Sequence, residues 1–463
     1  MPVSRPFDIA ADLDTPVSAY LKLRPFRPRF LLESVAGGMR VARYSFIGFG
    51  DCLEVRLDST GLAVGPEHYP RPADRDALLG ALRTALARAP HPYPDEAGLP
   101  LAGGLVGYSS YDLVRYFERL PAVARSDSTL PEACYVAPRS LLVFDHLTRG
   151  VTLLHDGDED ERQSLRRELV AALRGPLPQE PQPLRHAPPA PSLQRAEFIE
   201  RVRRVQSHIA AGDVYQLVLS VRFAGDCELD PFRAYRALRL LNPSPYLYFC
   251  EAGGATVVGS SPEALVRLTA GNAQLRPIAG TLPRGADAAA DEANAARLLA
   301  DPKEAAEHVM LVDLARNDLG RVARAGSVRV DPFRIIERYS HVMHIVSGVS
   351  GELAPGRDAF DLFAAAFPAG TLVGAPKVRA MEIIDQLEPV RRGLYGGTVG
   401  YFGSGGDMDQ AITIRTLVFS EGRYSFQAGA GIVADSVPER EHDEVLAKSA
   451  VLVRALELAG GEL

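Results

Sequence analysis

Two pairs of glutamates and one lysine have the types and spacing to bind a metal ion or an anion. Glu441, Glu444 and Lys448 occupy positions i, i+3 and i+7 of the last long helical pattern in the sequence. Glu304 and Glu307 repeat the i, i+3 spacing on another helical pattern. Residues spaced in this way lie on one face of a helix. Two such faces brought together would form a cage of carboxylates for a hard divalent cation, most naturally Mg²⁺. The alternative is that each face is simply solvated.

Glu263 and Arg415 are the other candidates for chemistry. Glu263 follows Pro262 and precedes the strand-like run ALVRL, and Arg415 alternates with apolar residues in the strand-like segment AITIRTLVF (411–419). A carboxyl group held on a rigid, mostly apolar element has a raised pKa and could serve as a general acid. An arginine in such a place can clamp a carboxylate with two hydrogen bonds. An internal salt bridge between these two residues would explain them equally well.

The elements that must position these residues are mixed helices and strands. Helical periodicity is strong in seven segments: 75–89, 159–173, 195–211, 291–299, 303–314, 378–387 and 441–458. Strand-like runs occur in groups between them, without the regular alternation of a parallel sheet. This order predicts an α+β fold with mainly antiparallel sheets. Proline clusters in residues 176–192, which we interpret as a linker between an N-terminal region (1–175) and a C-terminal region (193–463).

Composition excludes several classes of function. The chain has 463 residues, 46% hydrophobic and 24% charged, with a net charge of −7 and no dense run of Lys or Arg, so we expect neither a nucleic-acid nor a membrane partner. The sequence has no signal-peptide pattern, no apolar run long enough to span a membrane, and only scattered cysteines. These features predict a cytoplasmic protein.

Common catalytic and nucleotide-binding motifs are missing or broken. The sequence has no Gly-Lys dipeptide, so it has no Walker phosphate loop. The run Gly429-Ala-Gly431-Ile-Val-Ala434 resembles a dinucleotide fingerprint, but Pro438 would interrupt the helix that this motif must open. No cysteine lies in a glycine-flanked turn, and no G-x-S-x-G occurs, so a glutaminase or serine hydrolase within this chain is not expected.

A set of ordered motifs resembles the chorismate-utilising enzymes, and most closely the anthranilate synthase large subunits among them. The motifs are FLLESVAGGMRVARYSFIG, GGLVGYSSYDLVRYFE, RPIAGTLPRG, KEAAEHVMLVDLARNDLGRV, YSHVMHIVSGVSGEL, PAGTLVGAPKVRAMEII and the C-terminal E-x-x-E-x-x-x-K. They cover nearly the whole chain. The resemblance implies two antiparallel sheets packed face to face, with helices outside and the active site between them. It also implies a lyase that converts chorismate and ammonia to anthranilate and pyruvate, the first committed step of tryptophan biosynthesis.

The resemblance also implies ligands for a metal and for the substrate. Glu307 and Glu444 would bind Mg²⁺, supported by Glu304 and Glu441. The metal would hold the ring carboxylate of chorismate. The other substrate-binding residues implied are Arg415, Tyr395, Lys448, Gly429, Gly431 and Thr371.

The catalytic steps implied by the resemblance fall to two residues. Glu263 matches the general acid that protonates the departing ring hydroxyl. His344 matches the histidine linked with loss of pyruvate and aromatisation.

Two positions distinguish members of this family. Gln216 stands where the water-adding members of the family, isochorismate and salicylate synthases, look to have a lysine that acts as a general base. Glutamine cannot deprotonate water. Ala279 stands where 4-amino-4-deoxychorismate synthases carry a lysine nucleophile. Both residues favour ammonia as the reactant and anthranilate as the product. The alternatives are a 4-amino-4-deoxychorismate synthase and a non-catalytic, tryptophan-sensing subunit.

The resemblance further implies a partner and an inhibitor. Because this chain has no glutaminase motif, a separate glutamine amidotransferase subunit would supply ammonia. Ser34 in LLES, and Pro243, Ser244 and Tyr246 in NPSPY, resemble the family's site for feedback inhibition by tryptophan. LLES could instead be a strand end, and NPSPY a turn that leads into a strand.

Overall fold

The structure is a computed structural model that describes residues 8–10, 12–34, 43–94, 98–127, 129–179, 185–339 and 342–461. Its α-helices are α1 (Pro16–Lys22), α3 (Arg75–Ala87), α4 (Glu159–Arg174), α5 (Arg195–Ala210), α6 (Pro231–Leu241), α7 (Ala288–Ala300), α8 (Pro302–Gly320), α9 (Ala359–Ala366), α10 (Lys377–Leu387) and α11 (Pro438–Ala459). All of the helices expected from periodicity are present. The structure adds α1, α6 and α9. Helix α9 is buried along its whole length and therefore has no polar face to reveal it.

The helix that carries the first glutamate pair has a well-defined start. The Asp301 side chain accepts hydrogen bonds from the backbone N–H groups of Lys303 and Glu304, and Pro302 occupies the first helical turn. An aspartate cap followed by proline is typical of a helix N-terminus. The start of α8 is therefore fixed at Pro302, so Glu304 lies in the first turn of the helix.

The strands form one large sheet and one small sheet. In the described part of the chain, 20 strands are connected by hydrogen bonds into a continuous sheet, and β14, β17 and β16 form a separate three-stranded sheet. Every ladder between named strands is antiparallel in the described residues. The strands are β1 (Pro28–Glu33), β2 (Tyr44–Asp58), β3 (Gly61–Val64), β4 (Glu67–Tyr69), β5 (Gly104–Ser109), β6 (Ala133–Asp145), β7 (Gly150–His155), β8 (Ala190–Pro191), β9 (Gln216–Asp226), β10 (Tyr246–Ala252), β11 (Ala255–Ser261), β12 (Ala264–Thr269), β13 (Asn272–Leu275), β14 (Ile278–Pro283), β15 (Arg329–Val330), β16 (Ile335–Arg338), β17 (Val342–Val346), β18 (Val349–Glu352), β19 (Gly374–Ala375), β20 (Thr398–Gly403), β21 (Met408–Ile412), β22 (Thr416–Ser420) and β23 (Arg423–Ile432).

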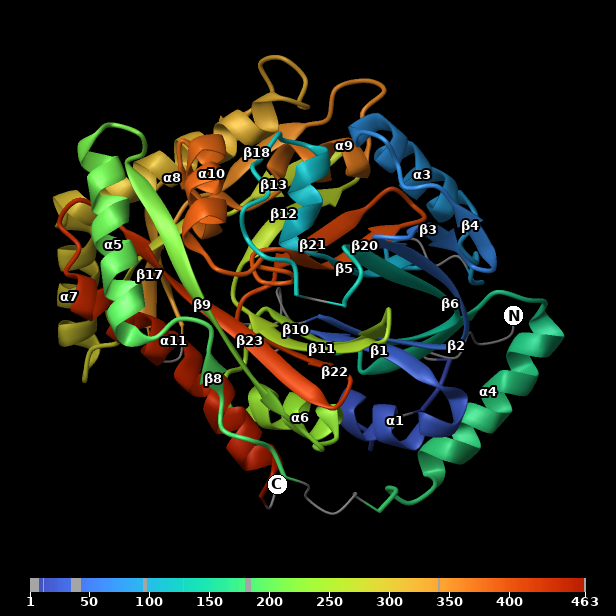
Figure 1. Cartoon of the computed structure of the whole chain (residues 1–463). Helices are drawn as coiled ribbons and strands as arrows, with labels where there is room; N and C mark the ends of the chain where they lie inside the picture. Colours follow the sequence, from blue (N-terminus) through green and yellow to red (C-terminus); the bar gives the residue numbers. More distant parts are fainter. Residues whose placement is uncertain are drawn as a thin grey trace.

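The large sheet folds over to make two layers (Figure 1). The first half of β2 pairs with β1 and its second half pairs with β3, while β6 pairs with β2 along most of its length. The β2–β6 register shifts between Phe49 and Cys52, where β2 passes from one set of partners to the other. Side chains of β1, β10 and β11 share a buried cluster with those of β5, β20 and β21. The predicted α+β class with antiparallel sheets is confirmed, and its two layers are parts of one continuous sheet.

The N-terminal and C-terminal regions contribute neighbouring strands to that sheet. Strand β1 pairs with β10, and β5 pairs with β20. Between the regions, the predicted linker ends in β8, which pairs with β9. Residues 180–184 of the linker lie outside the described residues. The boundary drawn at residues 176–192 therefore separates segments of sequence that share one sheet.

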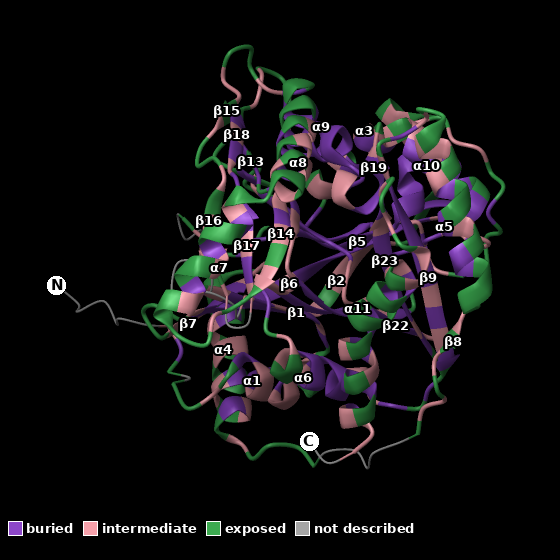
Figure 2. Ribbon diagram, turned by 90° about the vertical axis from the view of Figure 1, so that its left-hand side faces the viewer, coloured by how far each residue is buried: buried purple, intermediate pink, exposed green. Residues whose placement is uncertain are grey.

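Helices cover the outside of the sheet. Figure 2 shows buried residues along the central strands and exposed residues on the outer faces of helices such as α8. A second, larger apolar cluster lies between the sheet and these helices. No helix of the described residues is long and apolar enough to cross a membrane.

Candidate active site

A single cavity brings together all of the residues to which the sequence assigned a role. Its volume is 2770 Å³, and it is lined by residues from both regions of the chain. The residues predicted for catalysis and for substrate or metal binding that line it are Gln216, Glu263, His344, Thr371, Tyr395, Arg415, Gly429, Gly431, Lys448, Glu304, Glu307, Glu441 and Glu444. Ser34, Pro243, Ser244 and Tyr246, predicted for tryptophan, also line it. These placements are observed, and the individual roles stay predictions.

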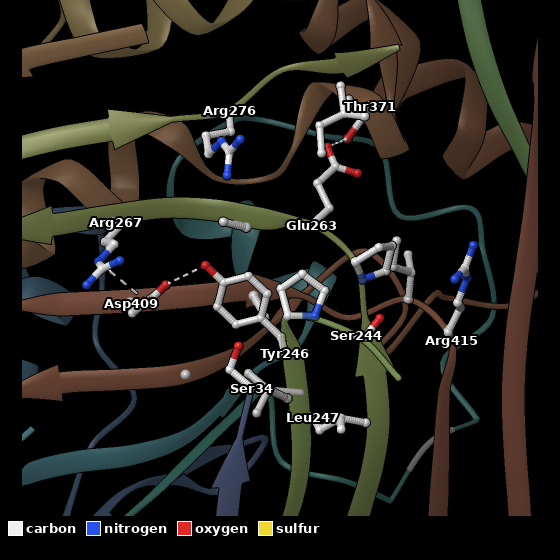
Figure 3. A pocket seen from close by; sticks show the side chains of 18 of the residues that line it. Ser34, Ser244, Tyr246, Leu247, Glu263, Arg267, Arg276, Thr371, Asp409 and Arg415 are labelled. Atoms are coloured by element: carbon white, nitrogen blue, oxygen red, sulfur yellow. Dashed lines mark hydrogen bonds and ion pairs between the residues drawn. The ribbon is translucent and has the colours of Figure 1, made fainter. Parts of the chain in front are cut away.

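We distinguish two sets of residues in the wall of this cavity, called its carboxylate end and its serine end, which adjoin where Asn242, immediately before Pro243, bonds Arg415. The carboxylate end is lined by Glu263, Arg415 and the four glutamates of α8 and α11. The serine end is lined by Ser34, Pro243, Ser244 and Tyr246. Figure 3 shows residues from both ends within one view.

Glu263 lies between β11 and β12 with its side chain facing the cavity. The Thr371 hydroxyl donates a hydrogen bond of 2.9 Å to Glu263 Oε1, which Figure 3 shows as a dashed line. Burial raises the pKa of Glu263 to about 7, against the opposing effects of the Thr371 bond and the Lys448 charge. A carboxyl group with such a pKa is protonated in a large fraction of molecules near neutral pH, as a general acid must be.

Arg415 lies between two strands, so its predicted position inside one strand (411–419) is wrong. Strand β21 ends at Ile412, β22 begins at Thr416, and Arg415 has a φ of 49°, in the left-handed region. The Thr413 N–H donates to the Gly397 carbonyl, and the Thr413 carbonyl accepts from the Gly396 N–H. After these two bonds the chain leaves the strand. The turn places the guanidinium at the cavity wall.

Arg415 has no carboxylate partner among the described residues. Its Nη1 donates to Asn242 Oδ1 at 3.1 Å, and burial lowers the pKa of its guanidinium. The described contacts include no salt bridge between Glu263 and Arg415. Glu263 bonds Thr371, and Arg415 bonds Asn242. A partly buried guanidinium without a carboxylate is suited to an anionic ligand.

The two glutamate pairs have the chemistry of a hard-cation site. Burial and then the charge of Glu307 raise the pKa of Glu304. Burial also raises the pKa of Glu441. A hydrogen bond with Ser436 lowers this pKa, and the charge of Glu444 raises it further. Carboxylates that repel one another in this way are stabilised by a divalent cation.

The donor set fits Mg²⁺ in chemical type. No group of three or more His, Cys, Asp or Glu side chains among the described residues is arranged to hold a metal ion by itself. Mg²⁺ usually retains several waters and takes only one or two protein carboxylates together with ligand oxygens. The Lys448 ammonium lies 2.7 Å from Glu444 Oε1.

Glycines on β23 keep the wall of the carboxylate end close to its neighbours. A Cβ atom at Gly429 would lie 2.7 Å from the Tyr395 hydroxyl oxygen, and one at Gly431 would lie 2.8 Å from Gln216 Nε2. Lys448 Nζ donates to the Gly429 carbonyl at 3.1 Å. Any larger side chain at these two positions would push into Tyr395 or Gln216.

Gln216 and His344 line the same cavity, and hydrogen bonds orient each side chain. Gln216 Nε2 donates to Glu307 Oε1 at 3.4 Å. His344 Nδ1 lies 2.9 Å from the Gly280 carbonyl oxygen, and burial lowers the pKa of the imidazole. A proton on Nδ1 shared with that carbonyl leaves Nε2 of a neutral ring able to accept a proton.

The serine end contains polar groups that are already paired with one another. The Tyr246 hydroxyl donates to Asp409 Oδ1 at 3.0 Å, and Arg267 lies 3.8 Å from Asp409 (Figure 3). Burial raises the pKa of Asp409 to about 6, and Arg267 and the Tyr246 bond oppose this. The Ser34 hydroxyl is buried and has no hydrogen-bond partner among the described residues.

The sequence assigned no role to Arg267 or Asp409. It named Asn242 only as the first residue of the NPSPY motif and did not predict its bond to Arg415. Arg267 and Asp409 meet because β12 pairs with β21, with Arg267 opposite Asp409 in the register. No local pattern in the sequence specifies that pairing.

Comparisons with known proteins agree with this geometry. A family model described as chorismate binding enzyme matches residues 28–454. Anthranilate synthase component 1 of Thermus thermophilus is 47% identical over 453 residues, covering 97% of this chain and 96% of that protein. The corresponding protein of Acinetobacter calcoaceticus is 45% identical, covering 98% and 95% of the two chains. The crystal structure of anthranilate synthase component I from Streptococcus pneumoniae superposes with a TM-score of 0.80 at 34% identity, covering 89% of this chain and 92% of that one.

Proposed function

The chain belongs to the chorismate-binding enzyme family, and we propose that it is a lyase that converts chorismate and ammonia to anthranilate, pyruvate and water. Similarity to anthranilate synthase component 1 proteins along nearly the whole chain supports this activity. The observation that carries the proposal is the composition of the carboxylate end. A protonatable Glu263, a guanidinium with no carboxylate partner in the described part of the chain and two glutamate pairs line one cavity.

The proposed reaction begins with binding of the chorismate dianion. Arg415 and Tyr395 would hold the enolpyruvyl carboxylate by hydrogen bonds and charge. Lys448, Thr371 and backbone groups of Gly429 and Gly431 would complete the anion pocket. Glu307 and Glu444, with Glu304 and Glu441 beside them, would hold Mg²⁺, which would neutralise the ring carboxylate and polarise the ring.

Proton transfers then complete the reaction. Glu263 would donate its proton to the ring hydroxyl, which leaves as water because protonation makes it a better leaving group. Ammonia would form a bond to the ring carbon next to the one that bears the carboxylate, and the ring double bonds would shift as the C–O bond to the hydroxyl breaks. The resulting ammonium group would return one proton to the Glu263 carboxylate. Nε2 of His344 would take up the proton from the aminated ring carbon as the C–O bond to the enolpyruvyl group breaks and the ring becomes aromatic. The imidazolium would then return a proton to the methylene carbon of the leaving group, which gives pyruvate.

Two cavity residues without a basic side chain support ammonia as the nucleophile. Gln216 donates its amide to Glu307 and cannot deprotonate a water molecule. Ala279 on β14 has no amine to add covalently to the ring. Both residues support direct amination, which disfavours 4-amino-4-deoxychorismate as the product.

The name component 1 of the relatives implies a second component. We propose a glutamine amidotransferase subunit that delivers ammonia, and tryptophan as an inhibitor that binds at the serine end. The buried Ser34 hydroxyl, which has no partner among the described residues, and the irregular Pro243–Ser244 segment between α6 and β10 support this location, because they can offer hydrogen-bonding groups to an amino acid.

The proposal is tested by product analysis with the purified chain, chorismate, Mg²⁺ and an ammonium salt. We expect fluorescent anthranilate with an equimolar amount of pyruvate. A non-aromatic amino product without pyruvate would indicate 4-amino-4-deoxychorismate synthase. No product would contradict the proposal and favour a non-catalytic sensing subunit.

A further inference from the structure

A fully buried ion pair lies behind the wall of the carboxylate end. Arg392 and Glu388 are each only 4% exposed. Arg392 Nε donates to Glu388 Oε2 at 2.9 Å and Nη2 donates to Oε1 at 2.7 Å. Neither residue lines the cavity in the described structure. Removing two charges from water is costly unless their remaining hydrogen-bonding groups are also satisfied. The partners of those groups therefore indicate what the pair does.

The remaining donors of Arg392 hold two segments of the cavity wall. Nη1 donates to Leu372 O at 2.6 Å, and Nη2 donates to Val218 O at 2.8 Å. Leu372 follows Thr371 in the short helix Gly370–Leu372, and Thr371 bonds the proposed acid Glu263. Val218 lies on β9, two residues after Gln216. One guanidinium thus connects the segment that holds the proposed acid with the strand whose Gln216 bonds Glu307, a proposed metal ligand.

Glu388 holds the same strand at another point. Its Oε1 accepts hydrogen bonds from the Ser220 N–H at 3.0 Å and from the Ser220 hydroxyl at 2.6 Å. Ser220 lies opposite Gly429 in the β9–β23 ladder. A Cβ atom at Gly429 would lie 3.0 Å from Ser220 Cβ, so the two strands are in close contact there.

The guanidinium also contacts the tyrosine of the proposed substrate pocket. Arg392 Cζ lies 4.9 Å from the ring centroid of Tyr111 and 5.6 Å from that of Tyr395. Both distances are within the range of cation–π attraction. The Tyr395 hydroxyl approaches Gly429 closely, so the position of this ring sets the width of the pocket.

We infer that the Arg392–Glu388 pair is a positioning device that fixes Thr371, Tyr395 and Gly429 relative to one another for the proposed reaction. This inference rests on the proposed function. Arginine is required because its planar fork donates in several fixed directions at once, whereas a lysine ammonium is a compact charge on a flexible stem. The competing explanation is that the pair only stabilises the fold.

The first test is Arg392→Lys, which keeps the charge opposite Glu388 but cannot reach both carbonyls. We expect kcat to fall by about 100-fold, because misplacement of the acid affects the chemical step, and the KM for chorismate to rise by a smaller factor, because Tyr395 and Gly429 are proposed to bind the substrate. The matched control is Arg162→Lys. Arg162 is also buried and bonds Asp8, Glu159 and the Leu153 carbonyl, but it does not line or contact the cavity wall. We expect this control to retain its kcat, with both variants checked for folding by circular dichroism.

The second readout separates positioning from stability. Glu263 faces Thr371 and Lys448, and both lower its pKa against the effect of burial. Loosening Thr371 should therefore shift the alkaline limb of the kcat profile upward by about half a pH unit. A purely structural role would leave that limb in place.

Ser220→Ala provides a milder variant that keeps the ion pair and the Cβ contact with Gly429. We expect about a fivefold fall in kcat, because the variant loses the hydroxyl bond to Glu388 and the bond of 2.7 Å that the hydroxyl accepts from Gln427 Nε2 at the cavity wall. A folded Arg392→Lys or Ser220→Ala variant with unchanged kcat and pH profile would overturn the inference. An unaltered chain that makes no anthranilate would instead overturn the proposed function, so the two failures are distinguishable.

Discussion

The carboxylate end and the serine end of the cavity hold their charged groups in opposite ways. At the carboxylate end, Lys448 pairs with Glu444 at 2.7 Å, but Arg415 has only an amide partner among the described residues, and the charge of Glu307 raises the pKa of Glu304. At the serine end, Asp409 accepts a bond from Tyr246 and lies near Arg267. Glu33, next to Ser34, is bonded by Arg239 at 2.9 Å and by the Tyr235 hydroxyl.

This difference indicates what each end can bind. Groups left without opposite charges gain most from a ligand that supplies them, such as a dianion together with a divalent cation. Groups that already neutralise one another favour a ligand with no net charge, which an amino acid is at neutral pH.

Glu263→Gln should produce the largest loss. The amide keeps the size of the side chain and can still contact Thr371, but it cannot donate an acidic proton. We expect kcat to fall by about 10²–10⁴-fold, the usual contribution of a general acid, with chorismate affinity little changed. Anthranilate fluorescence and calorimetry measure the two quantities. Substantial turnover in this variant would show that Glu263 is not the acid.

Removal of metal should stop the reaction, and changing one glutamate should weaken metal binding. We expect chelation by EDTA to abolish activity and added Mg²⁺ to restore it. Glu307→Gln should raise the Mg²⁺ concentration for half-maximal activity by about 10–100-fold. The control is Glu457→Gln. Glu457 is exposed near the end of α11, the helix that carries Glu444. Equal Mg²⁺ requirements in the two variants would argue against the glutamate cage.

Ser34→Ala should affect inhibition and not the chemical step. The buried Ser34 hydroxyl has no partner among the described residues. If the inhibitor forms a hydrogen bond with it, removal of the hydroxyl lowers the binding free energy of the inhibitor by about 1 kcal/mol. We expect the tryptophan concentration for half-maximal inhibition to rise about fivefold, relative to the uninhibited rate of each variant. Ser140→Ala, a buried serine bonded to His155 outside the cavity, is the control. If both serines gave the same response, the serine end would not be the inhibitor site.

The pH profile should report Glu263 directly. Burial raises its pKa to about 7, and an acid acts only while protonated, so kcat should decline as the pH rises through that value. Thr371→Val removes a hydrogen bond that lowers this pKa. We therefore expect the decline to begin about half a pH unit higher in the variant. A profile that moves to lower pH would show that the Thr371 bond acts in the opposite sense.

Local sequence patterns predicted much of the fold and the inventory of the site. Helical periodicity identified α8 and α11, and therefore the faces that carry the four glutamates. Family motifs identified residues that are far apart in sequence, and the structure places them on one cavity. A helix face or a motif is a local property, which explains why it can be read from one chain.

Long-range pairings could not be predicted in this way. Arg267 meets Asp409 through the β12–β21 register, and Arg392 reaches Val218 across 174 positions of sequence. The left-handed turn at Arg415 interrupts an apolar alternation that otherwise indicates one strand. In each case the determining contact comes from another element, and periodicity within the segment carries no information about it.

The most direct test of the contrast between the two ends is calorimetric titration of the same protein with chorismate and with tryptophan, with and without Mg²⁺ and in the absence of ammonium. We predict that removing Mg²⁺ weakens chorismate binding by at least about tenfold and changes tryptophan binding by less than about twofold. If Mg²⁺ changed the affinities for chorismate and tryptophan equally, or left the affinity for chorismate unchanged, the proposed contrast between the two ends would be wrong.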